Sequence, residues 1–421
     1  MLYNRVIRYC LFCLAGLVGL ASVAMPSDNA AAATVEPAAV ESSATVADDD
    51  DDESFFEVGG ALRLNLVLEN YESSIDRSNG YFTLDMWRID VEAAEAGLDF
   101  NLEYRFYPTF DTHFIKRGWV GYEPTETTRF QAGVTQVPFG NVPFASNSWW
   151  FQHGYYVGLE DNFGTGLKMM TEVAGLDLQM AYFLQPAPAG PSSTGASFGI
   201  GGDGRYSYDV IPTTQDSRLG NALDGDQSIR EMHQGNLRFA APLGNGSEIG
   251  VSAQAGELYN QALDEAELAT AYAAHADLNA GRFNVQPQVA YYNYRALNDD
   301  GTRSETVPMG AYRSGAYPVA AEGVLYQLSV SYALPVDAGP VSMLTFYNDY
   351  AYLDKQNGAF DDTQQNILGL SVTAGDLLVF VDVASGRNHP WLTDDFGTGL
   401  GPGAVDPEWN TRFNINIGYY F

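Results

Sequence analysis

A regular alternation of apolar and polar residues runs through this chain from Phe56 to its last residue, and it constrains the fold more than any other feature. Alternation with a period of two places one set of side chains on each face of a β-strand. The pattern therefore predicts an all-β chain. We count sixteen alternating runs, which span residues 56–70, 80–93, 97–107, 113–123, 127–137, 163–173, 175–186, 229–241, 246–260, 266–279, 282–295, 321–335, 339–352, 362–374, 375–386 and 407–421.

Two of these runs show how clear or how ambiguous the pattern is. In the run at 97–107, apolar residues such as Phe100 and Leu102 alternate with charged and polar ones. The run at 266–279 is rich in alanine, so an α-helix is the alternative there. Its neighbours and the alternating positions of Tyr272 and Leu278 favour a strand.

The connections between the runs alternate strictly between short and long. Short connections follow every even-numbered run, and several contain the Gly or Pro that tight turns require. They lie at 94–96, 124–126, 174–175, 242–245, 280–281, 336–338 and 374–375. Longer ones follow the odd-numbered runs, at 71–79, 108–112, 138–162, 187–228, 261–265, 296–320, 353–361 and 387–406.

This sorting of connections is typical of a transmembrane antiparallel up-and-down β-barrel with short periplasmic turns and long extracellular loops. In hydrocarbon an unpaired backbone group costs several kcal/mol, so strands that cross a membrane must close into a ring without edges. About sixteen strands lies in the range where the lumen is wide enough to hold water. We therefore expect such a barrel over residues 55–421, in the bacterial outer membrane.

The last ten residues form an amphipathic strand that ends on an aromatic residue. Phe413, Ile415 and Ile417 fall on one face, followed by Tyr419 and Phe421, and no turn or charged residue comes after them. This ending resembles the terminal strand of bacterial outer-membrane β-barrels, which close on Phe after alternating apolar residues. The alternative is a half-buried strand of a soluble β-protein.

Residues 1–24 have the pattern of a secretory signal peptide. Arg5 and Arg8 precede an apolar run, which is followed by small residues suited to cleavage. Both cysteines of the chain, Cys10 and Cys13, lie in this segment, so the mature chain is expected to lack disulfides and thiolate metal sites. Residues 25–54 are small and acidic without an apolar period, which predicts a disordered linker.

The chain is strongly acidic, with a net charge of -32. Removing the two basic and nine acidic residues of the first 54 leaves 19 basic and 44 acidic ones, a net charge of -25 for the expected barrel. Nucleic acid needs a basic surface, so this class of partner is excluded. The expected partners are outer-membrane lipid, lipopolysaccharide and small solutes or anions.

The region 113–151 carries the most specific motif. Lys116, Arg117, Gly121 and Tyr122 mark one run, and the next leads from Gly133 into a Pro-Phe-Gly formed by Pro138, Phe139 and Gly140. These two runs resemble the phosphate-selective porin O and P family closely over about forty residues, and the rest of the chain follows the family loosely. The resemblance implies a trimeric outer-membrane channel for small anions.

The connection at 138–162 is the candidate constriction loop. In porins the third outer loop resembles a flap that folds into the lumen, and Pro138, Phe139 and Gly140 stand where such a loop would begin. Trp149 and Trp150 are expected to pack the loop against the wall. The alternative, in which these aromatic residues anchor an external loop, stays open.

Basic residues on the polar faces of the runs are the candidate pore-lining residues. An Arg or Lys that faces lipid near the midplane costs about 2–4 kcal/mol, which favours the lumen for each. The candidates are Arg88, Arg105, Arg117, Arg129, Lys168 and Arg238. Carboxylates share the same faces, namely Asp90, Glu103, Glu172 and Asp177. A general porin for small hydrophilic solutes is therefore the primary hypothesis, and a phosphate- or anion-selective porin is the alternative.

Enzymatic readings find little support in the sequence. The five histidines lack metal-ligand spacing, and no Gly-x-Ser-x-Gly elbow occurs. We therefore expect no catalytic residues, no metal site and no cofactor. An outer-membrane barrel enzyme, of the phospholipase or protease kind, is the alternative from another class, and His153 is the one histidine that it would place in the third loop.

Overall fold

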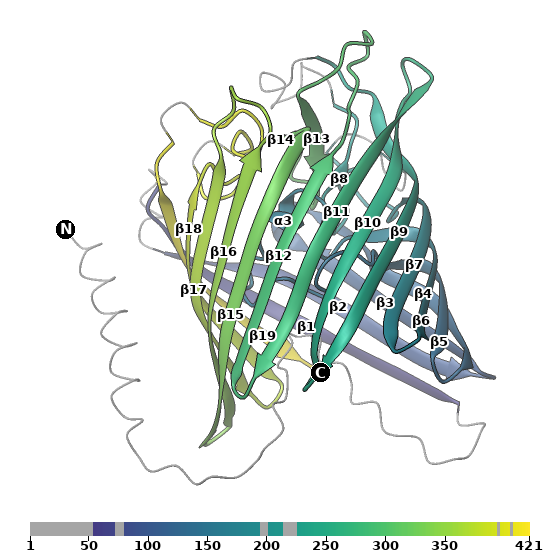
Figure 1. Ribbon diagram of the computed structural model, residues 1–421. Helices are drawn as coiled ribbons and strands as arrows, with labels where there is room; N and C mark the ends of the chain where they lie inside the picture. Colours follow the sequence, from purple (N-terminus) through teal and green to yellow (C-terminus); the bar gives the residue numbers. More distant parts are fainter. Residues whose placement is uncertain (1–53, 72–79, 194–200, 214–224, 394–395, 405–406) are drawn as a thin grey trace. The chain divides into compact units, whose positions relative to one another are not determined.

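The structure is a computed structural model that describes residues 54–71, 80–193, 201–213, 225–393, 396–404 and 407–421. The expected signal peptide, and the expected linker up to residue 53, lie outside the described residues. The described part forms a closed barrel of antiparallel strands in which each strand pairs with the next along the chain (Figure 1).

All sixteen alternating runs are strands of this barrel, so the predicted fold class is confirmed. The alanine-rich run is strand β11, and the helical alternative is wrong. The strands are β1 (Phe55–Glu69), β2 (Tyr81–Glu95), β3 (Leu98–Tyr107), β4 (Thr112–Thr125), β5 (Thr128–Gln136), β6 (Phe163–Val173), β7 (Leu176–Pro186), β9 (Ile229–Gly244), β10 (Ser247–Asn260), β11 (Glu265–Ala280), β12 (Phe283–Asn293), β15 (Glu322–Ala338), β16 (Val341–Lys355), β17 (Thr363–Ala374), β18 (Leu377–Arg387) and β19 (Asn410–Tyr420).

Each of the short connections is a two-residue turn, tighter than most of the predicted ones. The sequence places Ala94, Pro124 and Pro242 in turns, but they lie in β2, β4 and β9. The ladders continue to Ala94, which pairs with Asp99, and to Pro242, which pairs with Glu248. Between β6 and β7, Ala174 and Gly175 both have positive φ, at 55° and 79°. Two consecutive residues with positive φ match the right-handed twist of the strands that they join.

The two faces of the barrel differ as a membrane requires. Apolar side chains on the outer face stay exposed, and they include Leu62 and Leu64 of β1, Phe82 and Trp87 of β2, Phe100, Val120, Tyr122, Phe130, Leu167, Val251, Tyr272, Val289, Leu328, Leu368 and Tyr419. The inward positions carry polar residues such as Asn65, Asn414 and Asn416, which are buried. This exterior suits hydrocarbon, and the closed ladder leaves no strand edge unpaired in it.

The barrel closes where β1 pairs with β19. Leu62 lies opposite Tyr419, and Leu66 lies opposite Ile415. The last residue completes the ladder, because the amide of Gly60 donates to the carbonyl oxygen of Phe421 at 2.8 Å and the amide of Phe421 donates back at 3.0 Å. The alternating terminal strand is thus the seam of the ring.

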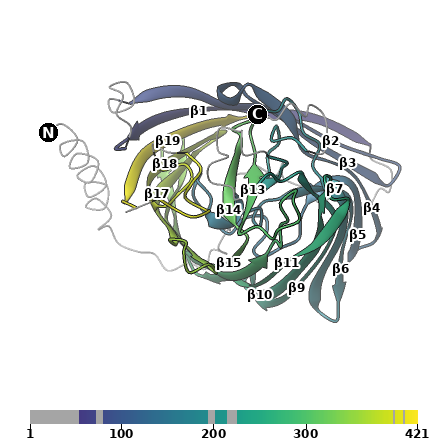
Figure 2. The ribbon, with the colours of Figure 1, turned by 90° about the horizontal axis from the view of Figure 1, so that it is seen from above.

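A second, three-stranded sheet lies inside the ring (Figure 2). It consists of β8 (Asp209–Val210), β13 (Thr306–Gly310) and β14 (Ala316–Ala320), which belong to the long connections after β7 and β12. The other elements in the described residues are two short helices, η1 (Pro108–Phe110) and α3 (His153–Tyr156). No helix in the described residues is long and apolar enough to cross a membrane.

The inner sheet and the third loop share one apolar core that is rich in tyrosine. The side chains of Tyr155, Tyr208 and Tyr317 are buried together with Met309. Two of the hydroxyls donate to loop carbonyls, that of Tyr317 to the oxygen of Tyr156 at 2.5 Å and that of Tyr155 to the oxygen of Tyr206 at 3.0 Å, and the hydroxyl of Tyr208 accepts from Nε1 of Trp391 at 2.8 Å. The long connections inside the barrel are therefore packed against one another as closely as side chains in a protein core.

Candidate functional site

The third loop, residues 137–162 between β5 and β6, crosses the lumen. In the strand order of the ring, β16 stands halfway round from β5. The carboxylate of Asp349 on β16 accepts the backbone amide of Asn147 at 3.0 Å and that of Ser148 at 2.7 Å. The side chain of Asn147 also donates to Ser329 on β15. Because Asp349 is fully buried beneath the loop, these bonds fix the far end of the loop to the opposite wall.

The near end of the loop is held by the walls of β9, β10 and β12. Gly140 donates its amide to the hydroxyl of Ser252 at 3.0 Å, and its carbonyl accepts from Nε of Arg238 at 2.8 Å. The next amide, that of Asn141, donates to Oε1 of Gln288 at 2.7 Å. The candidate Arg238 thus holds the loop backbone, and it also pairs with Glu248.

The carboxyl of Glu160, near the C-terminal end of the third loop, binds the middle of the loop and β15. Its Oε1 accepts from the amide of Ala145 at 3.1 Å and the hydroxyl of Ser146 at 2.9 Å, and its Oε2 accepts from Gln327 at 3.1 Å. Burial raises the pKa of Glu160 to about 7, despite these hydrogen bonds. In α3 of the same loop, burial lowers the pKa of His153 to about 3, so this side chain is neutral.

The tryptophans of the loop lie against the wall of β17 to β19. Trp150 is buried with Ile367 and Leu392, and the edge of Trp149 meets its ring at a centroid distance of 5.5 Å. The guanidinium of Arg412 lies 4.7 Å from the centroid of the Trp150 ring. These contacts pack the loop inside the barrel. They disagree with the alternative in which the aromatic residues anchor an external loop.

Three arginines converge on one carboxylate on the wall of β2 to β4. Glu103 of β3 pairs with Nη1 of Arg88 at 3.1 Å, with Nε of Arg105, and with Nε of Arg117 at 3.3 Å. Arg88 also pairs with Asp90 at 2.9 Å. We call these five residues the arginine cluster.

A β-bulge explains why both basic residues of the β4 motif face the lumen. The pairing of β3 with β4 shifts between Glu103 and Tyr104, so that Arg117 opposes Glu103 and Ile115 opposes Tyr104. Lys116 and Arg117 therefore both point inward. Nζ of Lys116 pairs with Asp161 of the third loop at 3.1 Å and lies 4.3 Å from the centroid of the Tyr206 ring.

The other basic candidates lie at different heights on the wall. Arg129 stands beside the turn between β4 and β5, where it pairs with Asp99 at 2.8 Å, so it is remote from the third loop. Lys168 donates to the carbonyl of Gln136, at the start of the loop, over 3.3 Å. The six candidates are thus split between the arginine cluster, the loop anchors and the periplasmic rim.

Sequence reasoning missed several basic residues of the lumen, among them Arg63, Arg412 and Lys116. Arg63 pairs with Asp85 at 3.0 Å, and Arg412 pairs with Glu69 at 3.4 Å. Both could be recognised from the alternation, since Arg63 lies between Leu62 and Leu64, and Arg412 shares the polar phase of Asn414. Lys116 was not, because a bulge breaks the period at its position.

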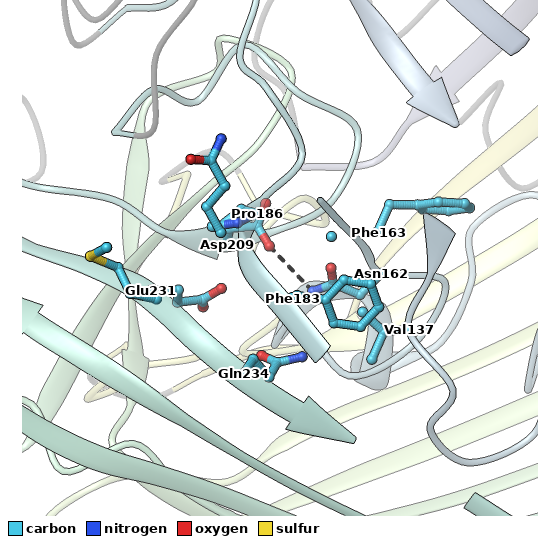
Figure 3. Close-up of a pocket in the computed structure, with 11 residues that line it drawn as sticks. Val137, Asn162, Phe163, Phe183, Pro186, Asp209, Glu231 and Gln234 are labelled. Atoms are coloured by element: carbon cyan, nitrogen blue, oxygen red, sulfur yellow. Dashed lines mark hydrogen bonds between the residues drawn. The ribbon is translucent and has the colours of Figure 1, made fainter. Parts of the chain in front are cut away.

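A small pocket opens between the base of the third loop and the wall of β6, β7 and β9 (Figure 3). Asn162 donates to Asp209 across it at 3.3 Å, and the carboxyl of Glu231 accepts the amide of Val210 at 3.1 Å. Burial raises the pKa of Asp209 to about 6. These groups tie the fourth long connection to the barrel wall, and within the described residues no group of three His, Cys, Asp or Glu is placed to hold a metal ion.

Solved outer-membrane channels share this architecture. An anion-selective porin from Comamonas acidovorans is 14% identical and matches 88% of this chain and 100% of its own, with a TM-score of 0.55. The outer membrane channel DcaP of Acinetobacter baumannii is 11% identical over 87% and 97%, with a TM-score of 0.54. OprB of Pseudomonas putida is 11% identical over 87% and 94%, with a TM-score of 0.51.

At these identities the likeness shows the fold, that of outer-membrane porins. No family model matches the chain, and no curated protein matches it. The phosphate-selective family that the β4 and β5 motif resembles is therefore not assigned by these comparisons.

Proposed function

We propose that this chain is an outer-membrane porin through which small hydrophilic solutes and ions diffuse. One observation carries the proposal. The third loop is bonded to the wall from β9 to β17 and packs against β18 and β19, while charged side chains on β1, β2 and β4 keep contact with solvent: 17% of Arg63, 18% of Asp90 and 26% of Arg117 are exposed. Water therefore reaches a charged strip of the lumen beside the loop.

This charged strip suits hydrated polar solutes and ions. Arginines and carboxylates alternate along it, as in Arg63 with Asp85 and Arg117 with Glu103. Paired charges of both signs can replace water around a polar solute without holding one sign of ion tightly. This pairing supports diffusion of many small solutes rather than capture of one.

Selective passage of anions is the second candidate. The basic residues on β1 to β9 support it, as do the resemblance to phosphate-selective porins and the anion-selective porin among the structural neighbours. The carboxylates on the same wall weigh against strong selectivity. We therefore propose a general porin with at most a weak preference for anions.

The remaining features of the proposal follow from the sequence. They are a signal peptide at 1–24, an acidic linker at 25–54, a constriction loop at 138–162, contact with outer-membrane lipid and lipopolysaccharide, and a homotrimer. The apolar exterior supports the lipid contact. The homotrimer rests on the family resemblance.

Conductance of the purified protein in planar lipid bilayers tests the function. We expect discrete steps that grow with KCl concentration, and a zero-current potential across a tenfold KCl gradient well below the Nernst limit. The mass of the detergent-solubilised protein tests the trimer. Recovery as a soluble periplasmic protein would overturn the proposal, as would hydrolysis of lipid or peptide by a protein that does not conduct.

A further inference from the structure

The carboxylate of Glu103 is the common partner of three guanidinium groups. It is 3% exposed, and each of its oxygens is engaged, Oε1 by Arg88 and Arg105 and Oε2 by Arg117. Arg105 also donates to the hydroxyl of Tyr107 at 3.0 Å. Charge-assisted bonds of this kind hold planar guanidinium groups in fixed orientations.

The formal charges of the arginine cluster nearly cancel. Three guanidinium groups face two carboxylates, those of Glu103 and Asp90, which leaves one positive charge. The neighbouring Arg63 is balanced by Asp85, and Lys116 by Asp161. Among the described residues of this wall, Glu103 pairs with three arginines, so its charge decides how positive this part of the wall is.

We propose that Glu103 determines the charge selectivity of the channel, as a built-in counter-ion of the arginine cluster. This inference rests on the proposed function. Arg117, the most exposed member, faces the water, while Glu103 behind it cancels much of the field that passing ions meet. Fixed charges beside a narrow water-filled passage concentrate ions of opposite sign, and salt weakens the effect.

The test is the zero-current potential of Glu103→Gln in a KCl gradient. Gln keeps the shape and an acceptor oxygen, but it raises the cluster from one net positive charge to two. Removing one unit negative charge about 4 Å away in water raises the local anion concentration about fivefold and lowers that of cations about fivefold, so we expect the anion-to-cation permeability ratio to rise on the order of 25-fold over wild type. The rise should shrink when both solutions are made concentrated in salt.

Two further variants separate charge from structure. Arg105→Gln should shift the potential towards cations, and the double variant Glu103→Gln/Arg105→Gln should return towards wild type because it restores the net charge. Glu126→Gln removes the same charge from an exposed turn and is the matched control, expected to change the ratio little. Circular dichroism and heat-dependent gel migration establish that each barrel has formed.

Each outcome decides a separate question. If wild type does not conduct, the proposed function fails. If wild type conducts and Glu103→Gln has the same zero-current potential, only the role of Glu103 is refuted. Should Glu103→Gln fail to assemble, the double variant is compared with Arg105→Gln: greater anion preference in the double variant supports the role, and equal potentials refute it.

Discussion

Gly140 shows how one residue keeps the third loop seated, which here means bonded to the inner wall of the barrel. Its φ is 66°, in the left-handed region, and a Cβ built there would lie 2.8 Å from Cδ of Gln288. Both of its backbone groups are bonded to the wall, to Ser252 and Arg238. The Pro-Phe-Gly of the β5 motif is therefore explained by a site where the chain must turn and approach the wall closely.

The first prediction concerns Gly140→Ala. A left-handed alanine costs about 1–2 kcal/mol, and its methyl group would push against Gln288. Seating of the loop should weaken by about 2 kcal/mol, which raises the unseated fraction about thirtyfold. Chymotrypsin cleavage after Trp149 or Trp150 measures that fraction. Gly358→Ala, at a position with open space around it, should behave as wild type; equal cleavage of the two variants would contradict the role of Gly140.

At the scale of elements, the third loop is joined to the barrel through buried carboxyls, and this makes its seating depend on pH. Burial raises the pKa of Glu160 from its ordinary value of 4.5 to about 7. The seated loop therefore prefers the protonated carboxyl. Its seating is strongest below pH 4.5 and loses about 3 kcal/mol as the pH rises to about 7.

The second prediction uses Glu160→Gln, which mimics the protonated form. At pH 7.5 the loop amides should exchange with solvent on the order of a hundredfold more slowly in the variant than in wild type, and at pH 4.5 the two should agree. Buried His153, with a pKa of about 3, weakens seating as the pH falls below 6.5, but it does so equally in both proteins. Hydrogen exchange followed by mass spectrometry measures the difference. Faster exchange in the variant at pH 7.5 would mean that the ionised carboxylate holds the loop.

For the whole molecule, closure of the ring depends on its last strand. Phe421 supplies the final two hydrogen bonds between β1 and β19, and its ring stacks at 6.0 Å from that of Tyr419 on the outer face. An unclosed barrel would expose two strand edges to hydrocarbon, which is far costlier than a bond lost in water.

The third prediction is that deletion of Phe421 lowers the amount of assembled barrel in the membrane. Two ladder bonds worth about 1 kcal/mol each are removed at the seam. Phe421→Leu keeps the backbone bonds and an apolar side chain, and it should assemble better than the deletion. Unheated gel electrophoresis of membrane fractions measures folded barrel, and equal amounts in wild type and the deletion would show that the terminal residue is dispensable.

The barrel could be predicted from the chain alone because its cause is local and repeated. Each strand must place apolar residues towards lipid at every second position. The sequences of β3 and β19 show this alternation directly. The order of short turns and long loops then fixes the topology. The lumen-facing positions of Arg88 and Arg105 follow from the same alternation.

The side-chain contacts inside the lumen could not be predicted from the sequence in the same way. That Asp349 holds the third loop depends on strands that face each other across the closed ring, and that Glu103 joins three arginines depends on the register of β2, β3 and β4. The bulge that turns both Lys116 and Arg117 inward breaks the period of β4, so the faces of these two residues follow only from the register of β3 and β4. Contacts of this kind arise from three-dimensional packing, because side chains distant in sequence meet only once the ring has closed.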